Sequence, residues 1–294
     1  MNGVLVIDKP AGPTSHDVVA RARRALRTRR IGHTGTLDPP ATGVLPLVVG
    51  RATRLASFLS GGEKEYVAGI RLGLATETYD AVGRESVPPV PAGITRDDVE
   101  EALQGFHGTF DQIPPPYSAK KIDGVRAYKL ARQRTPIRPP AARVTVHDLT
   151  LEHCSAGLVT LRVRASAGFY VRSLAHDLGR TLGCGAHLEA LRRIRAGSFG
   201  ERDAVMLSTL EHEGVEGARW IVPMEHLLPD VPAVVLSERD RERVAHGGDV
   251  RDEADPRPAV GAGATRRLFD GGGHLIAVAE LRPGGLLHPT IVLV

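Results

Sequence analysis

The sequence is poor in cysteine: Cys154 and Cys184 are its 2 cysteines, and they form no CxxC pair. A disulfide framework and a cysteine-rich zinc site are therefore excluded, and we expect a reducing, cytoplasmic compartment. No apolar run approaches the roughly 20 residues that span a bilayer. The chain also shows no basic segment followed by a long apolar stretch near its start. We therefore expect no membrane span and no secretory signal.

The sequence also lacks the spacings that hold metals and nucleotides. None of its 12 histidines lies in an HExxH pattern, and no GxxxxGK[ST] phosphate loop occurs, since no glycine precedes a lysine. We therefore expect no metal site and no cofactor. With 42% hydrophobic and 24% charged residues, and no Gly-x-y period, the chain is neither disordered nor collagen-like.

Positive charge is concentrated in three segments, although the whole chain of 294 residues carries only +4. Residues 1–60 contain 9 basic and 3 acidic side chains, residues 112–143 contain 8 and 1, and residues 160–202 contain 8 and 3. Together the segments carry +18, so the remainder carries −14. This segregation predicts a basic face for a polyanion such as nucleic acid. The alternative is solvated side chains in an arginine-rich chain, with 33 Arg and 5 Lys.

Hydrophobic periodicity and turn residues predict an α+β fold with a mixed, largely antiparallel sheet. Strands are expected at 3–8, 44–49, 65–72, 143–151 and 158–165, and helices at 17–27, 53–59, 95–104, 170–182 and 186–193. Residues 112–140 form a basic, proline-bearing insertion in which one short helix is expected at 127–134.

A proline-rich stretch predicts a domain boundary near residue 229. It separates a large domain, residues 1–228, from a C-terminal module, residues 229–294. In this module, strands are expected at 233–236, 266–269, 274–281 and 290–294, with a helix that Ser237 begins. That size and strand content suit a small β-barrel-like module.

The loop at residues 32–43 has the most unusual composition in the chain. It places three glycines, three threonines and two prolines around one carboxylate, Asp38. Pro39 disfavours a helical backbone at the residue before it. The sequence therefore predicts a rigid turn that presents Asp38 in a basic neighbourhood. Residue types alone leave open whether Asp38 has a chemical task or only caps the turn.

Five motifs follow one another between residues 2 and 200. They are VIDKPxG (6–12), GHTGTLDPxATG (32–43), KEY with RLG (64–66 and 71–73), GFYVRSL with DLG (168–174 and 177–179), and GCGAHL with LRR (183–188 and 191–193). In content and order they resemble the TruB family of pseudouridine synthases. The chain departs from the family pattern at Pro40, where Leu or Met is expected, but Asp38 is in place.

The resemblance implies an enzyme that isomerises uridine in RNA by breaking the N1–C1′ bond and rejoining the ribose to C5 of the base. It implies a pseudouridine synthase fold, and Asp38 as the essential carboxylate, acting at ribose C1′ or assisting glycal formation. Cleavage of a glycosidic bond builds positive charge on the sugar, which a carboxylate can stabilise or capture. The implied substrate is uridine-55 in the T-loop of tRNA, flipped out of its stem-loop.

The family motifs imply further residues of the active site. Arg172 is implied as the partner that holds Asp38, since a guanidinium can bind a carboxylate bidentately in a buried site. Tyr66 is implied to stack on the flipped base and to act as general base at C5. Tyr170 is implied to support the pocket, and His33 to fill the gap left by the base. Residue types alone favour a surface charge for Arg172 and a core aromatic for Tyr66.

Other residues are implied to contact the RNA. Lys9, Lys64 and Leu191 lie in the matching motifs, and residues 112–140 resemble the family's mobile, thumb-like lobe. In that lobe, Lys120, Lys121 and Arg126 are implied to bind phosphates, although a solvated surface loop is the alternative. Position and size suggest a PUA-like RNA-binding barrel at residues 229–294. Residues 203–294, however, hold 9 basic and 15 acidic side chains.

The leading hypothesis is therefore a monomeric, standalone tRNA pseudouridine synthase without a cofactor. Its basic segments are expected to form one positive face around one buried carboxylate. Two alternatives stay open: a guide-RNA-dependent synthase of the dyskerin type, and a tRNA-folding chaperone without catalysis. The long thumb-like insertion favours the standalone form.

Overall fold

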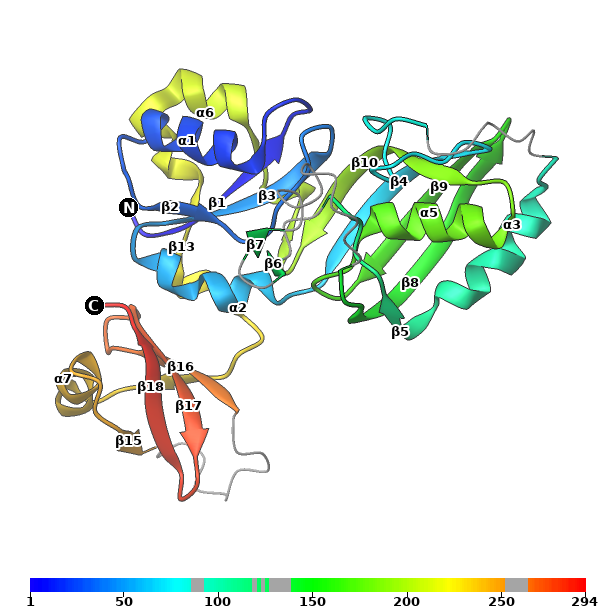
Figure 1. Ribbon diagram of the computed structural model, residues 1–294. Coiled ribbons are helices and arrows are strands. Elements are labelled where there is room, and N and C mark those ends of the chain that lie inside the picture. Colours follow the sequence, from blue (N-terminus) through cyan, green and yellow to red (C-terminus); the bar gives the residue numbers. More distant parts are fainter. Residues whose placement is uncertain (86–92, 118–120, 123–124, 127–138, 252–263) are drawn as a thin grey trace.

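A computed structural model describes residues 1–85, 93–117, 121–122, 125–126, 139–251 and 264–294 of the chain (Figure 1). One large sheet of eleven strands forms the upper part of the molecule in this view, and a smaller five-stranded sheet lies below it. The helix expected at 127–134 lies outside the described residues. Before residue 127, the insertion contributes two short paired strands, β6 (Lys121–Ile122) and β7 (Val125–Arg126).

The large sheet follows the order β12-β1-β3-β10-β4-β9-β8-β5, with β2, β11 and β13 paired beside this path. Its strands are β1 (Gly3–Lys9), β2 (Ile31–His33), β3 (Thr42–Val49), β4 (Lys64–Leu72), β5 (Gly108–Gln112), β8 (Ala142–Ser155), β9 (Leu158–Ala165), β10 (Ala186–Ala196), β11 (Phe199–Gly200), β12 (Val205–Met206) and β13 (Ile221–Pro223). The β1–β12 and β3–β10 pairs are parallel and the others antiparallel. The predicted mixed, largely antiparallel sheet is therefore confirmed.

Helices cover the two halves of this sheet separately. On one half, α1 (Ser15–Ala25) and α6 (Leu207–Glu213) pack on β1 and β3 through buried aliphatic side chains such as Val18 and Leu210. On the other half, α3 (Arg96–Leu103) and α5 (Val171–Thr181) pack on β4, β8, β9 and β10. Thr14 begins α1 through a capping box with Asp17, which explains why this helix is predictable from local chemistry. Between β3 and β4, η1 (Gly50–Leu55) and α2 (Ala56–Ser60) complete this part of the chain.

The prediction of a helix at 186–193 is wrong, because these residues form most of β10. This strand lies between β3 and β4 and joins the two halves of the sheet. Its register against β4 shifts between Leu188 and Ala190 and again between Arg193 and Arg195. Such irregularities interrupt the alternation that marks a strand in a sequence. Tertiary pairing therefore overrides a local pattern that resembles a helix.

A sharp turn leads from α5 into β10. The amide of Gly185 donates to the Gly179 carbonyl at 2.9 Å, and a β-carbon at Gly179 would lie 2.1 Å from the amide nitrogen of Ala186. Glycine is therefore required for the helix and the strand to approach this closely. The turn fixes the direction of β10 relative to the start of α5.

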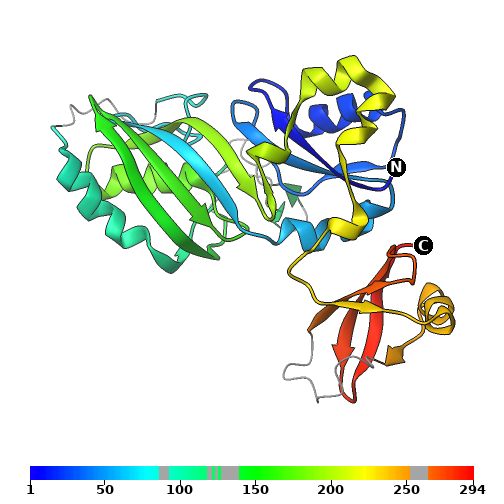
Figure 2. The same ribbon diagram turned by 180° about the vertical axis from the view of Figure 1, so that it is seen from behind.

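The C-terminal sheet has the order β14-β16-β17-β18-β15. Its elements are β14 (Ala233–Val235), α7 (Glu238–Ala245), β15 (Val250–Arg251), β16 (Thr265–Phe269), β17 (Leu275–Arg282) and β18 (Leu286–Val292). Leu275, Val278 and Leu293 share an apolar cluster with Val4 and Val6 of β1, so this sheet packs against the large one (Figure 2). The domain boundary near residue 229 stays a prediction; it falls in the segment between η5 (Met224–His226) and β14.

Candidate active site

Asp38 lies in the loop that joins β2 to β3, and this loop is fixed to the start of α1. The amide of Ala41 donates to the Asp38 carbonyl at 3.1 Å, which closes the turn. The Ser15 hydroxyl donates to the Leu37 carbonyl at 2.9 Å and accepts the Leu37 amide proton at 2.8 Å. The residue before Asp38 is therefore held to a helix by both of its backbone polar groups.

Lys9, at the end of β1, lies beneath the same loop. Its side chain is fully buried, and its ammonium donates to the carbonyls of Pro10 and Pro39 at 3.0 Å and of Ala41 at 2.7 Å. An ammonium has three protons to donate, so all three serve the backbone. Burial lowers the pKa of Lys9 to about 8, and the negative charge of Asp38 opposes that shift.

Arg193 of β10 holds both ends of the loop. Its guanidinium donates to the Val44 carbonyl at 2.7 Å and to the Gly35 carbonyl at 3.1 Å, and its side chain is buried. Gly43 pairs with Arg193 in the parallel β3–β10 ladder, has φ +99°, and would place a β-carbon 2.2 Å from the Arg193 carbonyl. The glycine that ends the loop is therefore required by this close approach.

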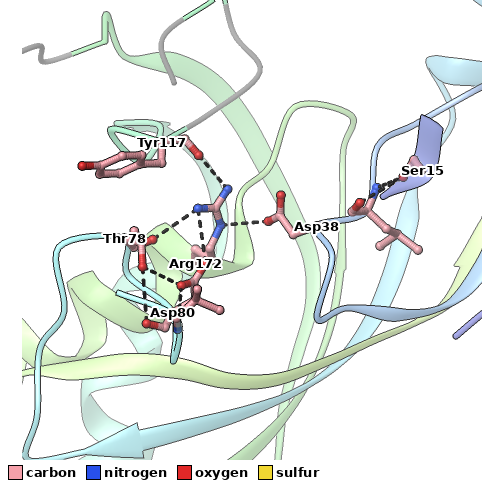
Figure 3. A network of polar contacts seen from close by, with 8 residues as sticks. Ser15, Asp38, Thr78, Asp80, Tyr117 and Arg172 are labelled. Carbon is pink, nitrogen blue, oxygen red and sulfur yellow. Dashed lines mark hydrogen bonds and ion pairs between the residues drawn. The ribbon is translucent and has the colours of Figure 1, made fainter. Parts of the chain in front are cut away.

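Arg172, in the first turn of α5, points at Asp38 (Figure 3). Its Nε lies 3.0 Å from Oδ2 of Asp38, and the two side chains are 8% and 39% exposed. The remaining guanidinium nitrogens donate to the carbonyls of Thr78 at 3.2 Å and Tyr117 at 3.0 Å, and one lies 3.5 Å from the Asp80 carboxylate. Arg172 thus gathers three segments of the chain around one cation.

This geometry corrects two expectations about the Asp38–Arg172 pair. The carboxylate is partly exposed rather than buried, and Arg172 is the buried partner. The pair is also joined through Nε alone rather than bidentately, because the other nitrogens are used by Thr78, Tyr117 and Asp80. One oxygen of Asp38 is therefore anchored by a cation while the side chain remains accessible from solvent.

Asp80 is held in a compact turn that packs beside Arg172 (Figure 3). Its Oδ1 accepts protons from the Thr78 hydroxyl at 2.5 Å and the Val82 amide at 3.1 Å, and its carbonyl accepts the Thr76 hydroxyl at 2.7 Å. Residue 80 also bridges in parallel to Leu188 of β10. The second carboxylate near Arg172 is therefore buried and fixed, unlike Asp38.

Asp38 and Arg172 border a cavity of about 270 Å³. Most of the candidate site residues line it: Asp38, Lys64, Tyr66, Tyr170, Arg172 and Leu191. Residues 34–37 of the loop and 166–169 before α5 complete the wall, together with Ser60, Val171 and Arg193. An aromatic ring, an anchored carboxylate and buried cations therefore meet around one space.

Tyr66 reaches the cavity from β4. It is directly opposite Arg193 in the β4–β10 ladder and opposite Val163 in the β4–β9 ladder. Burial lowers the pKa of the Arg193 guanidinium, and the neighbouring Tyr66 side chain opposes the shift. The half-buried ring also packs against both apolar clusters of the large sheet.

Tyr170 and His33 occupy different positions relative to this cavity. Tyr170 lines it just before α5, where its amide donates to Gln112 Oε1 at 2.8 Å and its carbonyl accepts from Gln112 Nε2 at 3.0 Å. His33 ends β2, next to Thr34 of the wall, and stacks edge-on against His16 with centroids 5.2 Å apart. Burial lowers the pKa of His33, which favours the neutral ring.

Lys64, like Lys9, binds backbone carbonyls with its ammonium group. The Lys64 ammonium donates to the Ser60 and Gly62 carbonyls at 2.5 and 2.6 Å, and burial lowers its pKa to about 8. Lys121 lies on β6 and Arg126 on β7, whereas Lys120 lies outside the described residues. The structure therefore brings Lys9 and Lys64 to the site as supports of the backbone.

Part of the positive charge of the basic segments is neutralised within the chain. Arg192 contacts Asp8 at 3.1 Å and Glu201 at 2.7 Å, and Arg21 contacts Glu211 at 2.6 Å. Arg162 and Arg164 are paired with glutamates as well. The net charge of these segments is thus a poor guide to the charge that a ligand meets.

Within the described ranges, no group of three or more His, Cys, Asp or Glu side chains could hold a metal ion. No helix in the same part of the chain is both long and apolar enough to cross a membrane.

Sequence reasoning missed four residues that build the site: Ser15, Asp80, Gln112 and Arg193. Each acts on a partner that is distant along the chain, so no local spacing marks it. Arg193 lies inside the LRR motif, which is the one signal that could have singled it out.

Known proteins resemble the chain along its whole length. Residues 23–171 match the N-terminal domain of TruB family pseudouridylate synthases, and residues 172–229 match the C-terminal domain of tRNA pseudouridylate synthase B. The tRNA pseudouridine synthase B of Solibacter usitatus (strain Ellin6076) is 43% identical over 295 residues, which cover 100% of both chains. That of Azoarcus sp. (strain BH72) is 42% identical over 293 residues, which cover 99% of this chain and 95% of the relative.

Solved structures with a similar fold come from H/ACA assemblies. A chain in an H/ACA RNP bound to a substrate RNA containing 2′-deoxyuridine superposes with a TM-score of 0.74 at 26% identity, covering 99% of this chain and 85% of that one. A chain in a Cbf5-Nop10-Gar1 complex superposes with a TM-score of 0.75 at 26% identity, with the same coverage.

Proposed function

Since this chain belongs to the TruB family of pseudouridylate synthases, we propose that it isomerises uridine-55 in the T-loop of tRNA to pseudouridine. The observation that carries this proposal is the Asp38 carboxylate, anchored to Arg172 at 3.0 Å yet 39% exposed at the edge of a cavity. A carboxylate in this state can reach a sugar once a base has entered the cavity. The two relatives are tRNA pseudouridine synthases, which indicates tRNA as the substrate class.

In the proposed reaction, the target nucleotide leaves its stack and enters the cavity. The N1–C1′ bond breaks, positive charge builds on the ribose, and Asp38 captures C1′ or assists glycal formation. The base then rotates so that C5 faces C1′, and the C5–C1′ bond forms while any bond between Asp38 and C1′ breaks. The proton on C5 leaves, and N1 takes up a proton. Atoms are conserved throughout, so the overall reaction is an isomerisation.

Arg172 keeps Asp38 ready for this reaction. Its Nε contact fixes one of the two carboxylate oxygens, and the rigid turn directs the other. Thr78, Tyr117 and Asp80 contact the remaining nitrogens and hold the guanidinium in place. The guanidinium therefore keeps its position while the charge on the substrate changes during the reaction. Arg172 is therefore an electrostatic support that is organised before substrate binds.

Tyr66 supplies the aromatic face for the flipped base and the group that accepts the C5 proton. Its position opposite Arg193 places a fixed cation beside the phenolic oxygen. Leu191 and Tyr170 line the same cavity and limit how the base can lie. His33, at the entrance of the loop, is suited to fill the place that the base leaves in the RNA.

One chain acting as a monomer binds the T-arm in this proposal. The thumb-like insertion supplies phosphate contacts through Lys120, Lys121 and Arg126, and the PUA-like C-terminal module adds surface for the rest of the tRNA. No cofactor is needed, because a carboxylate, a tyrosine and an arginine suffice for the bond changes.

The test uses the purified protein alone and an unmodified tRNA transcript labelled with tritium at C5 of uridine. Isomerisation replaces the C5–H bond and releases tritium to water. We expect release from the wild-type transcript and none from a transcript in which cytidine replaces uridine-55. Equal release from both transcripts would contradict the assignment of uridine-55.

The same assay separates the alternatives. The fold similarity to chains of H/ACA assemblies is the observation that favours the alternative, a guide-RNA-dependent synthase. Release that requires an added guide RNA would support that type. Tight tRNA binding without any release would support a folding chaperone.

A further inference from the structure

An aromatic contact near Asp80 has no part in the chemistry proposed above. Tyr79 and His176 stack with ring centroids 3.7 Å apart and planes only 10° from parallel. Tyr79 immediately precedes Asp80 in the turn, and His176 lies on α5 one helical turn beyond Arg172. The stack therefore joins the two elements that place Asp80 and Arg172 side by side.

The backbone of Tyr79 shows that this turn is held against a local preference. Its φ is +63°, in the left-handed region that bulky residues rarely adopt. The Tyr79 carbonyl accepts the Leu188 amide proton at 3.0 Å, and the Tyr79 amide donates to the Thr76 carbonyl at 3.3 Å. Such a conformation persists only where the surroundings impose it. Here β10 holds the backbone, and the His176 ring holds the side chain.

We propose that the Tyr79–His176 stack positions Asp80 and the Thr78 carbonyl, and through them Arg172, for the isomerisation. The inference rests on the proposed function. Neither ring lines the cavity around Asp38, so both are positioning residues that act through Arg172. After removal of either ring, the turn stays attached to β10, and its described contacts with α5 at this point are those of Arg172 itself. The Thr78 carbonyl and Asp80 are then no longer fixed independently of Arg172.

Substitutions of His176 separate the ring contact from other roles. Nδ1 of His176 is buried without a hydrogen-bond partner, so Phe keeps the stacking surface without losing a bond at that nitrogen. We expect His176→Ala to lower kcat about fivefold to tenfold with an unchanged Kd for tRNA, whereas His176→Phe stays within about twofold of wild type. A His176→Phe variant as slow as His176→Ala would overturn the role of the stack.

A double-mutant cycle tests whether the effect passes through Asp80. If it does, adding His176→Ala to Asp80→Asn lowers kcat by a smaller factor than adding it to wild type, because the Asp80 carboxylate is already absent and only the Thr78 carbonyl is left to position. Effects that multiply in the double variant would contradict the proposed route. Melting temperatures measured alongside identify any variant whose loss of rate reflects unfolding.

A second readout does not depend on catalysis. The Nε–H nuclear magnetic resonance signal of Arg172, assigned by its disappearance in Arg172→Lys, is expected to be sharp in wild type and in His176→Phe. In His176→Ala it is expected to weaken through faster exchange with water. An unchanged signal in His176→Ala would overturn the positioning role, even if wild type isomerises tRNA. The expected signals from a wild-type protein that releases no tritium would support the role and refute the proposed function alone.

Discussion

Two regions of the molecule use the same physical device, a cation that collects backbone carbonyls. Lys9 binds three carbonyls, two of which, those of Pro39 and Ala41, belong to the Asp38 loop. Arg267 of β16 holds the segment before β14 through the carbonyls of Val231, Leu227 and Pro229 at 2.8, 3.1 and 3.4 Å. In the first region, the fixed backbone presents a carboxylate to a cavity. In the second, it connects two sheets.

The difference lies in what surrounds each cation. Lys9 belongs to a group of cations with Arg193 and Arg172, and this group encloses one partly exposed acid, Asp38. Arg267 instead lies near the Phe269 ring, with its Cζ 5.4 Å from the ring centroid. A cation that binds several backbone carbonyls therefore fixes the segment that carries them. Whether the fixed segment takes part in the proposed reaction depends on the side chain that it presents, which is Asp38 in the first region.

Apart from Asp38 itself, the largest effect is expected at Arg172. Lysine keeps the charge but cannot contact Asp38, Thr78 and Tyr117 together, so Arg172→Lys should lower single-turnover tritium release about 100-fold. The Kd for tRNA from filter binding should stay near that of wild type. A loss of affinity with an unchanged rate would assign Arg172 to RNA binding instead.

The variants Lys9→Met and Arg267→Met test directly whether the two carbonyl-binding cations differ in their effect on the reaction. Both should lower the free energy of unfolding by about 1–3 kcal/mol, because backbone carbonyls that are mostly withdrawn from water lose their donors. Only Lys9→Met should also slow tritium release, by about tenfold, since it releases the turn that orients Asp38. Urea denaturation and single-turnover rates measure the two effects. Similar rate losses in both variants would remove the distinction between the regions.

Charge in the insertion should affect binding more than chemistry. Neutralising Lys120, Lys121 and Arg126 to glutamine should weaken tRNA binding and reduce the slope of log K against log[salt] by about 0.9 for each phosphate that the protein no longer neutralises. The rate at saturating tRNA should change little. As a matched control, the α7 triple variant Arg239→Gln/Arg241→Gln/Arg243→Gln should change the slope less. Equal changes in the two variants would place the phosphate contacts equally in both regions.

The smallest effect expected is a pH-dependent difference in stability. The pKa of Lys9 is about 8 in the folded chain and has its ordinary value of 10.5 when unfolded. Between these values the unfolded chain binds more protons, so the stability of wild type should rise relative to Lys9→Met as pH increases from about 8 to 10.5. Urea titrations of both proteins across this range measure the difference. A difference that falls with pH would contradict the cause assigned to the shift.

Local chemistry carries much of the prediction of the fold. The expected helix start at Ser237 is present, and the expected strands at 143–151 and 158–165 are β8 and β9, which pair with each other as neighbours along the chain. The strand β10 escapes prediction because it is stabilised by partners more than a hundred residues away in the chain, and its shifted register hides the alternation. Elements defined by long-range pairing are therefore the ones that sequence patterns miss.

The residues of the candidate site also fall into two groups, those that the sequence identifies and those that only the structure shows. The loop composition and the family resemblance single out Asp38, Tyr66 and Arg172, which the structure places around one cavity. The exposure of Asp38 and the burial of Lys9 are not predictable, because both depend on how distant strands enclose the loop. A sequence thus identifies the reactive groups more readily than the groups that hold them.

The most direct test of the account compares Asp38→Asn with wild type in single-turnover tritium release from the tRNA transcript. Asparagine keeps the size of the side chain but loses the negative charge, so it cannot stabilise or capture the developing sugar cation. We predict a loss of at least about 1,000-fold in rate with a tRNA Kd close to that of wild type. Release by Asp38→Asn at the wild-type rate would contradict the central claim that the anchored carboxylate carries out the chemistry.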